Sequence, residues 1–306
     1  MGKAGHGAAA LQAAYLTEPA PQRIKTASPR GNPVPFFVIA YPAFDPVLVS
    51  IGPFPIRWYA LAYIAGLLLG LLYARALVMR EGLWGGAPHP TRASLEDLVV
   101  YAALGVVLGG RLGYVLFYNL PYYVSEPAEI IAVWKGGMSF HGGLAGATLG
   151  IVVFARRFKT SALGVADLCA AAAPIGIGLG RVANFIKPEL WGRITDAPWG
   201  VVFPGAGASA RHPSQLYEAG LEGVALFAVL WAAVRLGALG RPGLVTGLFG
   251  IGYGVARTIC EFFREPDPQL GFLFGGATMG MLLSLPLIIM GAVFVANAAR
   301  RMPAAA

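Results

Sequence analysis

The 306-residue sequence has little charge and almost no cysteine. Only 12% of its residues are charged, about half the share that is usual in soluble domains. This deficit excludes an ordinary soluble enzyme and a disordered chain, because too few solvated side chains exist to cover a surface in water. Both cysteines, Cys169 and Cys260, lie inside apolar runs without CxxC spacing. We therefore expect small buried hydrophobes there, and no disulfide framework, reactive thiol or metal site.

The sequence also lacks the signatures of nucleotide and nucleic-acid binding. The glycine strings at 142–146 and 176–180 have neither the GxGxxG nor the Walker spacing. The net charge of +8 does not indicate a nucleic-acid partner, since the cations lie between apolar blocks. No internal duplication of the kind found in many secondary transporters is visible.

Long apolar runs make up most of the sequence, which is 57% hydrophobic. A bilayer core of about 30 Å needs about 20 mostly apolar residues per helix. The runs predict an all-α integral membrane protein with seven transmembrane helices, at 57–79, 98–118, 140–157, 167–186, 215–234, 243–263 and 273–297. Residues 1–33 are rich in Ala, Pro and Gly and predict a disordered N-terminal extension. Repeated prolines in 34–55 exclude a spanning helix, so we expect this stretch at the membrane interface.

Basic residues in the connections predict the orientation of the spans. One set of connections holds nine of them, at Arg80, Arg92, Arg156, Arg157, Lys159, Arg235, Arg241, Arg300 and Arg301. The alternate set holds five, at Lys135, Lys187, Arg193, Arg211 and Arg264. This asymmetry places the C-terminus in the cytoplasm and the start of the first span outside. The cations of the N-terminal extension oppose this assignment, but they lie too far from the first span to orient it.

Polar side chains within the predicted spans gather in the outer half of the membrane. They are Arg57, Tyr59, Tyr63, Arg111, Tyr114, Tyr118, Asn119, His141, Arg181, Asn184, Tyr217, Glu218, Glu222, Tyr253, Arg257, Glu261 and Arg264. Such residues are costly in a bilayer and indicate function. A conduction pathway would distribute them through the whole depth or at the midplane. The one-sided pattern favours a cavity that opens to the outer leaflet and holds a lipid headgroup.

Two arginines are the candidate anion ligands of this cavity. Tyr253, Arg257 and Glu261 are four residues apart and form one stripe of a helix, while Arg181 and Asn184 share a face. A guanidinium binds phosphate through two parallel hydrogen bonds and stays charged in apolar surroundings. We therefore predict that Arg181 and Arg257 together clamp a phosphodiester.

An equally weighted alternative gives these charges a structural role only. Arg257 would then pair with Glu218 or Glu261, and Arg111 with another acid, to hold helices together. Asp167, at the other end of the fourth predicted span, is best explained as the N-cap of its own helix.

His141 and Glu189 are the candidates for proton transfer. His141 opens the third span, and a neutral imidazole there can accept a proton from a nucleophile; the alternative is a packing or hydrogen-bonding role. Glu189 follows the fourth span and is either an acid or base, or a loop carboxylate paired with Arg193. From its position alone, Tyr59 indicates an interfacial anchor.

Several strings occur in a characteristic order. They are FDP at 44–46, RWY at 57–59, GGRLGYVLFYN at 109–119, GGMSFHGG at 136–143, RHPSQLYE at 211–218 and EFFREPD at 261–267. The chain from about Tyr41 to Arg301 thereby resembles the prolipoprotein diacylglyceryl transferase family. The family signature, Gly-Arg-x-Gly/Ala-Asn-Phe-x-Asn-x-Glu-x-x-Gly, is nearly met at 180–192, with Lys187 in place of Asn and Pro188 in place of the usual Gly.

The resemblance implies transfer of the diacylglyceryl group of phosphatidylglycerol to the thiol of the lipobox cysteine in a precursor's signal peptide. The products are a thioether and glycerol phosphate, and the location is the bacterial inner membrane. The reaction needs no cofactor or metal, and no nucleic-acid partner is expected. The resemblance also implies a seven-helix body over 34–301 with a small periplasmic head, for which 186–214 is the candidate, followed by a tail at 302–306.

The resemblance further implies roles for particular residues. Those carried over are Tyr59, His141, Arg181, Asn184, Glu189, Gly192, Tyr253 and Arg257. We expect Arg181 and Arg257 to grip the phosphate, with His141 as the base or as an organiser near the thiol. Asn184 and Tyr253 would orient headgroup oxygens. Further substrate-site candidates are Arg111 and the acids that would hold Arg257 in place, Glu218 and Glu261. The competing hypothesis is a lipid or anion transporter with a vestibule in the outer leaflet.

Overall fold

Helices dominate the structure, a computed structural model that describes residues 39–42, 44–266 and 271–300. The long helices are α2 (Trp58–Val78), α3 (Leu95–Phe117), α5 (Phe140–Arg157), α6 (Ala162–Ile186), α9 (Leu244–Glu261) and α10 (Met279–Arg300). Shorter helices are α4 (Leu120–Ser125), α7 (Ser214–Glu218) and α8 (Leu226–Arg235). A π-helical segment, Ala219–Ala225, joins α7 to α8 into one continuous helix. The predicted extension at 1–33 and the tail at 302–306 lie outside the described residues.

Each of the seven predicted spans corresponds to a helix, but two of the predicted starts are wrong. The fourth helix begins at Ala162 and not at 167, because the Ser161 side chain accepts a hydrogen bond from the backbone N–H of Gly164 and caps the helix there. The last helix begins at Met279 and not at 273, because residues 274–276 form a 3₁₀ turn in which Gly275 has a left-handed φ of 67°.

Five of these helices are long and apolar enough to cross a membrane. They are Trp58–Val78, Arg92–Phe117, Ala162–Ile186, Ser214–Arg235 and Met279–Arg300. The other two, α5 and α9, have 18 residues each. They are rich in glycine and carry charged residues, such as Arg156 and Arg157 in α5. Length and composition therefore identify five candidate spans, and two shorter helices accompany them.

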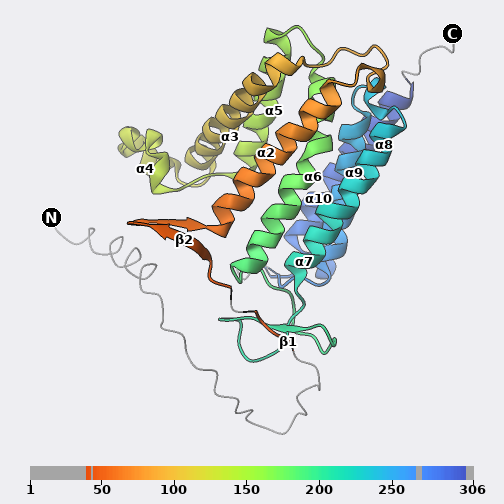
Figure 1. The fold of residues 1–306 in the computed structure, drawn as a ribbon. Coiled ribbons are helices and arrows are strands. Elements are labelled where there is room, and N and C mark those ends of the chain that lie inside the picture. The colour runs from red at the N-terminus through yellow and green to blue at the C-terminus, as the bar shows by residue number, and fades with distance from the viewer. Residues whose placement is uncertain (1–38, 43, 267–270, 301–306) are drawn as a thin grey trace. The chain divides into compact units, whose positions relative to one another are not determined.

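The helices pack in close pairs, α3 with α5, α2 with α6 and α9 with α10 (Figure 1). Glycines four residues apart make the α3–α5 contact a backbone-to-backbone one. A Cβ atom added at Gly105, Gly109 or Gly146 would overlap backbone atoms of the facing helix. Such close approach is the usual effect of small residues at this spacing in membrane helices.

One end of the bundle contains the apolar core and the start of α9. Its largest buried side chains are Trp84, Phe154, Leu168, Leu230 and Leu239. Asp167, which is fully buried here, does not cap its own helix as predicted. Its carboxylate accepts hydrogen bonds of 2.7 Å from the backbone N–H groups of Gly243 and Thr246 and from the Thr246 hydroxyl. Asp167 lies in α6, five residues after this helix begins, and its carboxylate caps the start of α9.

The opposite end carries two small sheets that the all-α prediction did not include. Strands β2 (Val47–Ile51) and β3 (Phe54–Arg57) form an antiparallel hairpin that leads directly into α2. Strand β1 (Ile39–Ala40) pairs in parallel with β4 (Val201–Val202), which belongs to the connection between α6 and α7. This connection folds at the end of the bundle where α6 ends and α7 begins (Figure 1).

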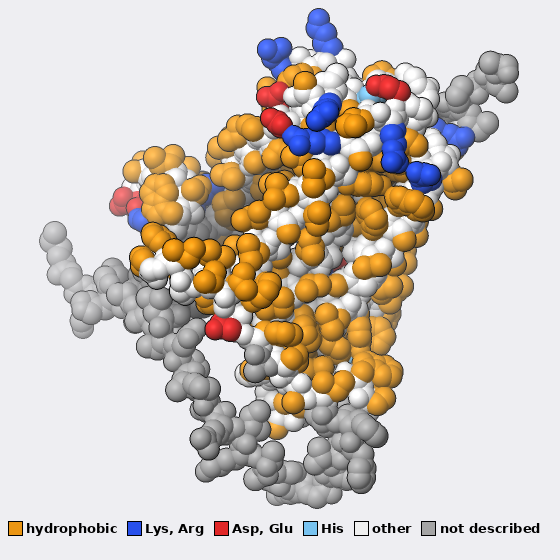
Figure 2. All heavy atoms as spheres, viewed as in Figure 1, with side chains coloured by type: hydrophobic (Ala, Val, Ile, Leu, Met, Phe, Trp, Pro, Cys, Tyr) orange, Lys and Arg blue, Asp and Glu red, His pale blue; other side chains and the backbone are white. Residues whose placement is uncertain are grey.

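Apolar and basic side chains occupy different parts of the bundle surface. In the face shown, hydrophobic side chains cover the sides of the helices, and Lys and Arg gather at the end where α2 is joined to α3 and α8 to α9 (Figure 2). An apolar belt bounded by a basic end is typical of a protein embedded in a bilayer.

The α3–α5 contact generates a stability prediction. Gly109→Ala is expected to lower the Tm in detergent by about 5 °C or more, because the new Cβ forces the two backbones apart. Gly180→Ala in α6 is the matched control, since its Cβ would meet no atom within 4 Å. Equal Tm values for the two variants would contradict the close packing.

Candidate functional site

Six charged side chains form a network at the end of the bundle that carries the sheets. We call them the arginine–glutamate network: Arg181, Glu218, Glu222, Arg257, Glu261 and Arg264. They come from α6, α7, the π-helical segment, α9 and the turn after α9.

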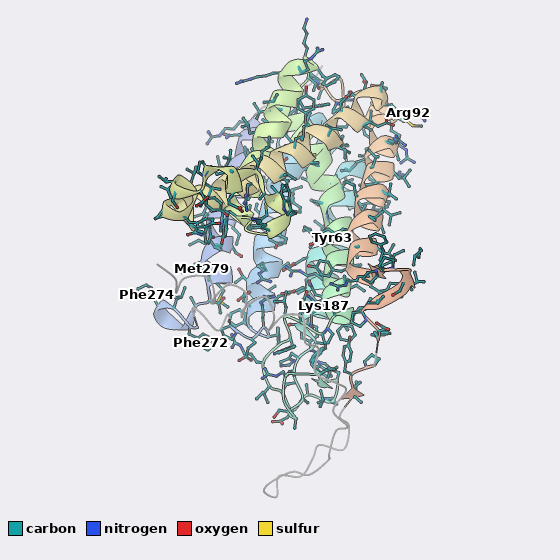
Figure 3. The ribbon with its side chains drawn as sticks, turned by 90° about the vertical axis from the view of Figure 1, so that its left-hand side faces the viewer. Tyr63, Arg92, Lys187, Phe272, Phe274 and Met279 are labelled. Carbon is teal, nitrogen blue, oxygen red and sulfur yellow. The ribbon has the colours of Figure 1, made fainter. Side chains whose placement is uncertain are left out.

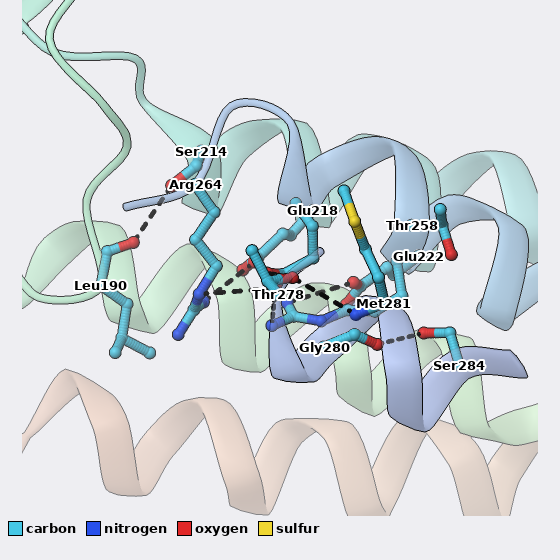
Figure 4. Close-up of polar contacts among 12 residues, drawn as sticks. Leu190, Ser214, Glu218, Glu222, Thr258, Arg264, Thr278, Gly280, Met281 and Ser284 are labelled. Carbon is cyan, nitrogen blue, oxygen red and sulfur yellow. Dashed lines mark hydrogen bonds and ion pairs between the residues drawn. The ribbon is translucent and has the colours of Figure 1, made fainter. Parts of the chain in front are cut away.

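Glu218 lies at the centre of the network. One carboxylate oxygen, Oε1, lies 2.6 Å from Arg257 Nη1 and 3.0 Å from Arg264 Nη1. The other oxygen, Oε2, lies 3.1 Å from Arg181 Nη1. A single buried carboxylate therefore brings together the two arginines that the sequence singled out. It also pairs with a third, Arg264, which lies beside Glu218 in Figure 4.

Glu222 binds Arg181 from the π-helical segment. Its Oε2 accepts hydrogen bonds from Arg181 Nε at 3.0 Å and from Arg181 Nη2 at 2.9 Å. The π-helical segment and α6 approach closely here, as a Cβ added at Gly223 would lie 2.7 Å from the Cα of Gly178. π-helical turns occur frequently at functional sites, and this one carries the second carboxylate of the network.

Glu261 completes the network from the last turn of α9. It pairs with Arg257 one turn earlier, as the four-residue stripe suggested, and its Oε1 lies 3.8 Å from Arg264 Nε. Its other oxygen, Oε2, accepts a hydrogen bond of 2.5 Å from the hydroxyl of Thr278. Arg257 is thus held by Glu218 and by Glu261, whereas the sequence had left the choice between them open.

Burial separates the two signs of charge. The side chains of Glu218 and Glu222 are 0% exposed and that of Glu261 is 4% exposed, whereas the three arginine side chains are 15–19% exposed. The glutamate side chains are therefore enclosed, whereas each arginine side chain is partly exposed. Each guanidinium has five N–H donors, and those not used by a glutamate can bind an anion.

A second polar group lies where α6 ends and α2 begins. Glu189 accepts a 2.9 Å hydrogen bond from Asn184 Nδ2 and forms a 2.7 Å ion pair with Lys187 Nζ. Lys187 Nζ lies 6.0 Å from the ring centre of Tyr59, which stacks at an angle on Tyr63. Tyr63 and Lys187 lie at the same end of the bundle, far from Arg92 (Figure 3). The proposed pairing of Glu189 with a different cation, Arg193, is wrong.

Gly192 and Arg193 instead attach the α6–α7 connection to the end of α9. Arg193 donates to the backbone carbonyls of Glu261 and Arg264 at 2.9 Å each. Gly192 is enclosed, since a Cβ there would lie 2.5 Å from the carbonyl oxygen of Phe263. Both residues therefore stabilise the turn that carries the network.

Arg111 does not pair with an acid, contrary to the alternative that the sequence allowed. Its guanidinium donates to the backbone carbonyls of Glu129, Ile130, Gly136 and Gly137. The residue is buried and holds the connection between α4 and α5 in place, and none of its contacts in the described part of the chain joins it to the network.

His141 lies apart from the network, at the exposed start of α5. It lines a cleft of about 330 Å³ with residues from α3 and α5, namely Phe117, Tyr118, Ser139, Gly142 and Ala145. No member of the network lines this cleft.

Tyr253 stacks on Phe249 with ring centres 5.8 Å apart and has no hydrogen bond within the described ranges.

An apolar pocket of about 420 Å³ lies on the neighbouring face of α7. Its lining residues are Trp199, His212, Tyr217, Gly220, Leu221 and Phe263. The hydroxyl of Tyr217 accepts a 2.7 Å hydrogen bond from Trp199 Nε1 and lies 3.1 Å from His212 Nδ1. Burial lowers the pKa of His212, which favours the neutral form of its ring.

Sequence reasoning did not single out Arg264, which belongs to the network, or Thr278, which contacts it. Arg264 was one of many polar residues in the outer half, and only its position seven residues after Arg257 could have placed it on the same side of the chain. Thr278 lay inside a predicted span and carried no signal. In the described residues, no group of three or more His, Cys, Asp or Glu is arranged to hold a metal ion.

Fold and site together define a multi-pass membrane protein with a buried cluster of arginine and glutamate at one end of its helices. The chain belongs to the prolipoprotein diacylglyceryl transferase family, whose model matches residues 46–297. A protein of Methylocella silvestris named phosphatidylglycerol–prolipoprotein diacylglyceryl transferase is 67% identical over 265 residues, which cover 87% of this chain and 97% of that protein. Proteins of the same name from Beijerinckia indica and Rhodopseudomonas palustris are 63% and 56% identical, over 86% and 88% of this chain and 96% and 94% of their own lengths.

The burial of the carboxylates generates a second stability prediction. Glu218→Ala is expected to lower the free energy of unfolding by about 3–5 kcal/mol, because three guanidinium groups lose the carboxylate with which they pair. Glu96→Ala is the matched control, since Glu96 pairs with Arg75 at the same 2.6 Å but is 75% exposed, and it should have little effect. Thermal unfolding in detergent measures both. Similar losses for the two variants would contradict the structural weight given to Glu218.

Proposed function

We propose that the chain transfers the diacylglyceryl group of phosphatidylglycerol to the thiol of the lipobox cysteine of a prolipoprotein. The sulfur forms a bond to the glyceryl carbon, the bond from that carbon to the phosphate oxygen breaks, and glycerol phosphate leaves with the electron pair. The thiol proton passes to a base. The observation that carries this proposal is the network of outward-lying guanidinium groups over buried carboxylates, in a chain whose relatives bear that enzyme's name.

We further propose that all seven long helices cross the bacterial inner membrane, with the network end on the periplasmic side. The basic end shown in Figure 2 then lies in the cytoplasm together with the end of α10. The α6–α7 connection at 187–213 would form the periplasmic head. In this orientation the network lies in the outer leaflet, where a phospholipid headgroup can reach it from the side.

Arg181 and Arg257 are assigned to the phosphate. Both share Glu218 and keep part of the side chain exposed, and N–H donors that no glutamate uses can converge on one phosphodiester. Charge develops on the departing phosphate in the transition state, and fixed cations stabilise it without reorganisation. The glutamates stay with the arginines and keep them fixed in a medium of low dielectric constant.

His141 is assigned to the thiol proton. The cleft beside it is large enough to admit a cysteine side chain, and its imidazole is exposed to that cleft. A thiol attacks as the thiolate, and its ordinary pKa of about 8.5 keeps it mostly protonated at neutral pH. Asn184, Glu189, Tyr59 and Tyr253 are assigned to the hydroxyl and ester oxygens of the lipid.

Arg181→Lys separates a guanidinium clamp from a simple cation. We expect it to lower kcat/KM by about 100-fold or more, because the ammonium keeps the charge but loses the paired donors. Purified protein is incubated with phosphatidylglycerol and a lipobox peptide, and mass spectrometry reads the gain of one diacylglyceryl unit on cysteine. Arg75→Lys at the basic end is the control and should remain active. Uptake of lipid into vesicles without peptide modification would instead indicate a transporter.

His141→Gln tests the assignment of the base. The deficit of this variant is expected to be largest near pH 6–7 and to narrow towards pH 9, where the peptide thiol ionises without help. The ratio of wild-type to variant transfer rates across pH 6–9 measures it. Full activity of the variant over the whole range would remove His141 from the mechanism, and a deficit that does not change with pH would make it an organiser.

A further inference from the structure

The start of α10 encloses one carboxylate of the network. Thr278 is 2% exposed and is the N-cap of α10, since its hydroxyl oxygen accepts a hydrogen bond from the backbone N–H of Met281. The hydroxyl proton is donated to Glu261 Oε2 at 2.5 Å. A threonine hydroxyl has one proton, so the whole donor capacity of Thr278 is directed at the carboxylate (Figure 4).

The other oxygen of this carboxylate faces the arginines. Glu261 Oε1 contacts Arg257 and lies 3.8 Å from Arg264 Nε. Rotation about the terminal bond of a glutamate is soft, so the carboxylate needs further contacts to keep this division of its two oxygens. Thr278 supplies one of them by occupying Oε2.

Gly280 allows the carboxylate to lie here because glycine has no side chain. A Cβ added at Gly280 would lie 2.5 Å from both Cδ and Oε1 of Glu261. The backbone of α10 at Gly280 therefore lies close to the carboxylate, and a side chain at this position would displace it. Thr278 and Gly280 together form a socket for Glu261, two positions apart at the start of the same helix.

We propose that Thr278 is a positioning residue that acts through Glu261 to orient the guanidinium of Arg257 towards the lipid phosphate. This inference rests on the proposed function and adds to it a role for α10, which contributes no charge to the network. Loss of the hydroxyl leaves Glu261 free to rotate, and Arg257 then keeps its charge but loses its fixed direction.

The test compares variants that alter the hydroxyl, the space and the carboxylate. Thr278→Val removes the donor at nearly constant shape and is expected to lower kcat by about tenfold, whereas Thr278→Ser restores most of it. Gly280→Ala keeps the cap and is expected to give a similar loss, because it displaces the same carboxylate. Thr258→Val is the matched control and should behave as the wild type, since the Thr258 hydroxyl donates only to the backbone carbonyl of Gly254.

A double-mutant cycle separates positioning from helix capping. In the Glu261→Gln background, Thr278→Val should cost little further activity if it acts through Glu261. A second full tenfold loss in that background would overturn the inference, as would wild-type kcat in the single variant. Failure of Thr278→Ser to recover activity would also count against it, because the hydroxyl would then not be the group that matters.

A binding measurement distinguishes this inference from the proposed function itself. Phosphatidylglycerol micelles are expected to raise the Tm of the wild type and of Thr258→Val more than that of Thr278→Val. A wild type that shows this rise but modifies no lipobox peptide would contradict the proposed reaction and leave the role of Thr278 supported. Equal rises in all three proteins would overturn the role of Thr278 even if the wild type is active.

Discussion

The structure of the site depends on one fully buried carboxylate. Glu218 contacts Arg181, Arg257 and Arg264, which belong to three different segments of the chain. Removing an ionised carboxylate from water is unfavourable unless cations and hydrogen-bond donors replace the solvent. The three guanidinium groups do so, and Glu222 and Glu261 balance the remaining positive charge. Any anion that binds this network is therefore held by unused N–H donors in a fixed geometry and not by an excess of charge.

The positions of the helices could be predicted from the sequence because hydrophobicity over about 20 residues is a local property. All seven apolar runs are helical. The predicted start at 167 was wrong because a polar residue inside a helix was taken for its end, and the start at 273 was wrong because the residues just before Met279 form a 3₁₀ turn. Asp167 illustrates the reason. A carboxylate near the end of an apolar run looks like a cap for that run, whereas this one reaches the backbone of α9, 76 residues away in sequence. Strands β1 and β4 could not be predicted, since two-residue pairings leave no periodic pattern. The longer β2–β3 hairpin lies in the stretch 34–55, whose prolines excluded a spanning helix but did not indicate strands.

The contact within one helix was predicted better than the contacts between segments. The stripe of Arg257 and Glu261 follows from helix geometry alone, and their contact agrees with it. Arg111 and Glu189 show the limit, because the sequence offers several partners of suitable charge for each. Arg111 donates hydrogen bonds to backbone carbonyls of a loop 18–26 residues away, and Glu189 pairs with Lys187, the cation nearer to it in sequence. Such choices are decided by loop conformation, which a single sequence does not specify.

The π-helical segment has a consequence for the helix that contains it. Glu218, Glu222, Leu226, Leu230 and Val234 are all buried and are all four residues apart. In a regular α-helix of 3.6 residues per turn, a four-residue repeat drifts steadily round the axis and leaves the buried side. The wider π turn at 219–225 rotates the chain in the opposite sense and cancels much of this drift. One side of the continuous α7–α8 helix can thus remain buried along its whole length. Its first turns bring glutamates to that side, and its last turns bring aliphatic side chains.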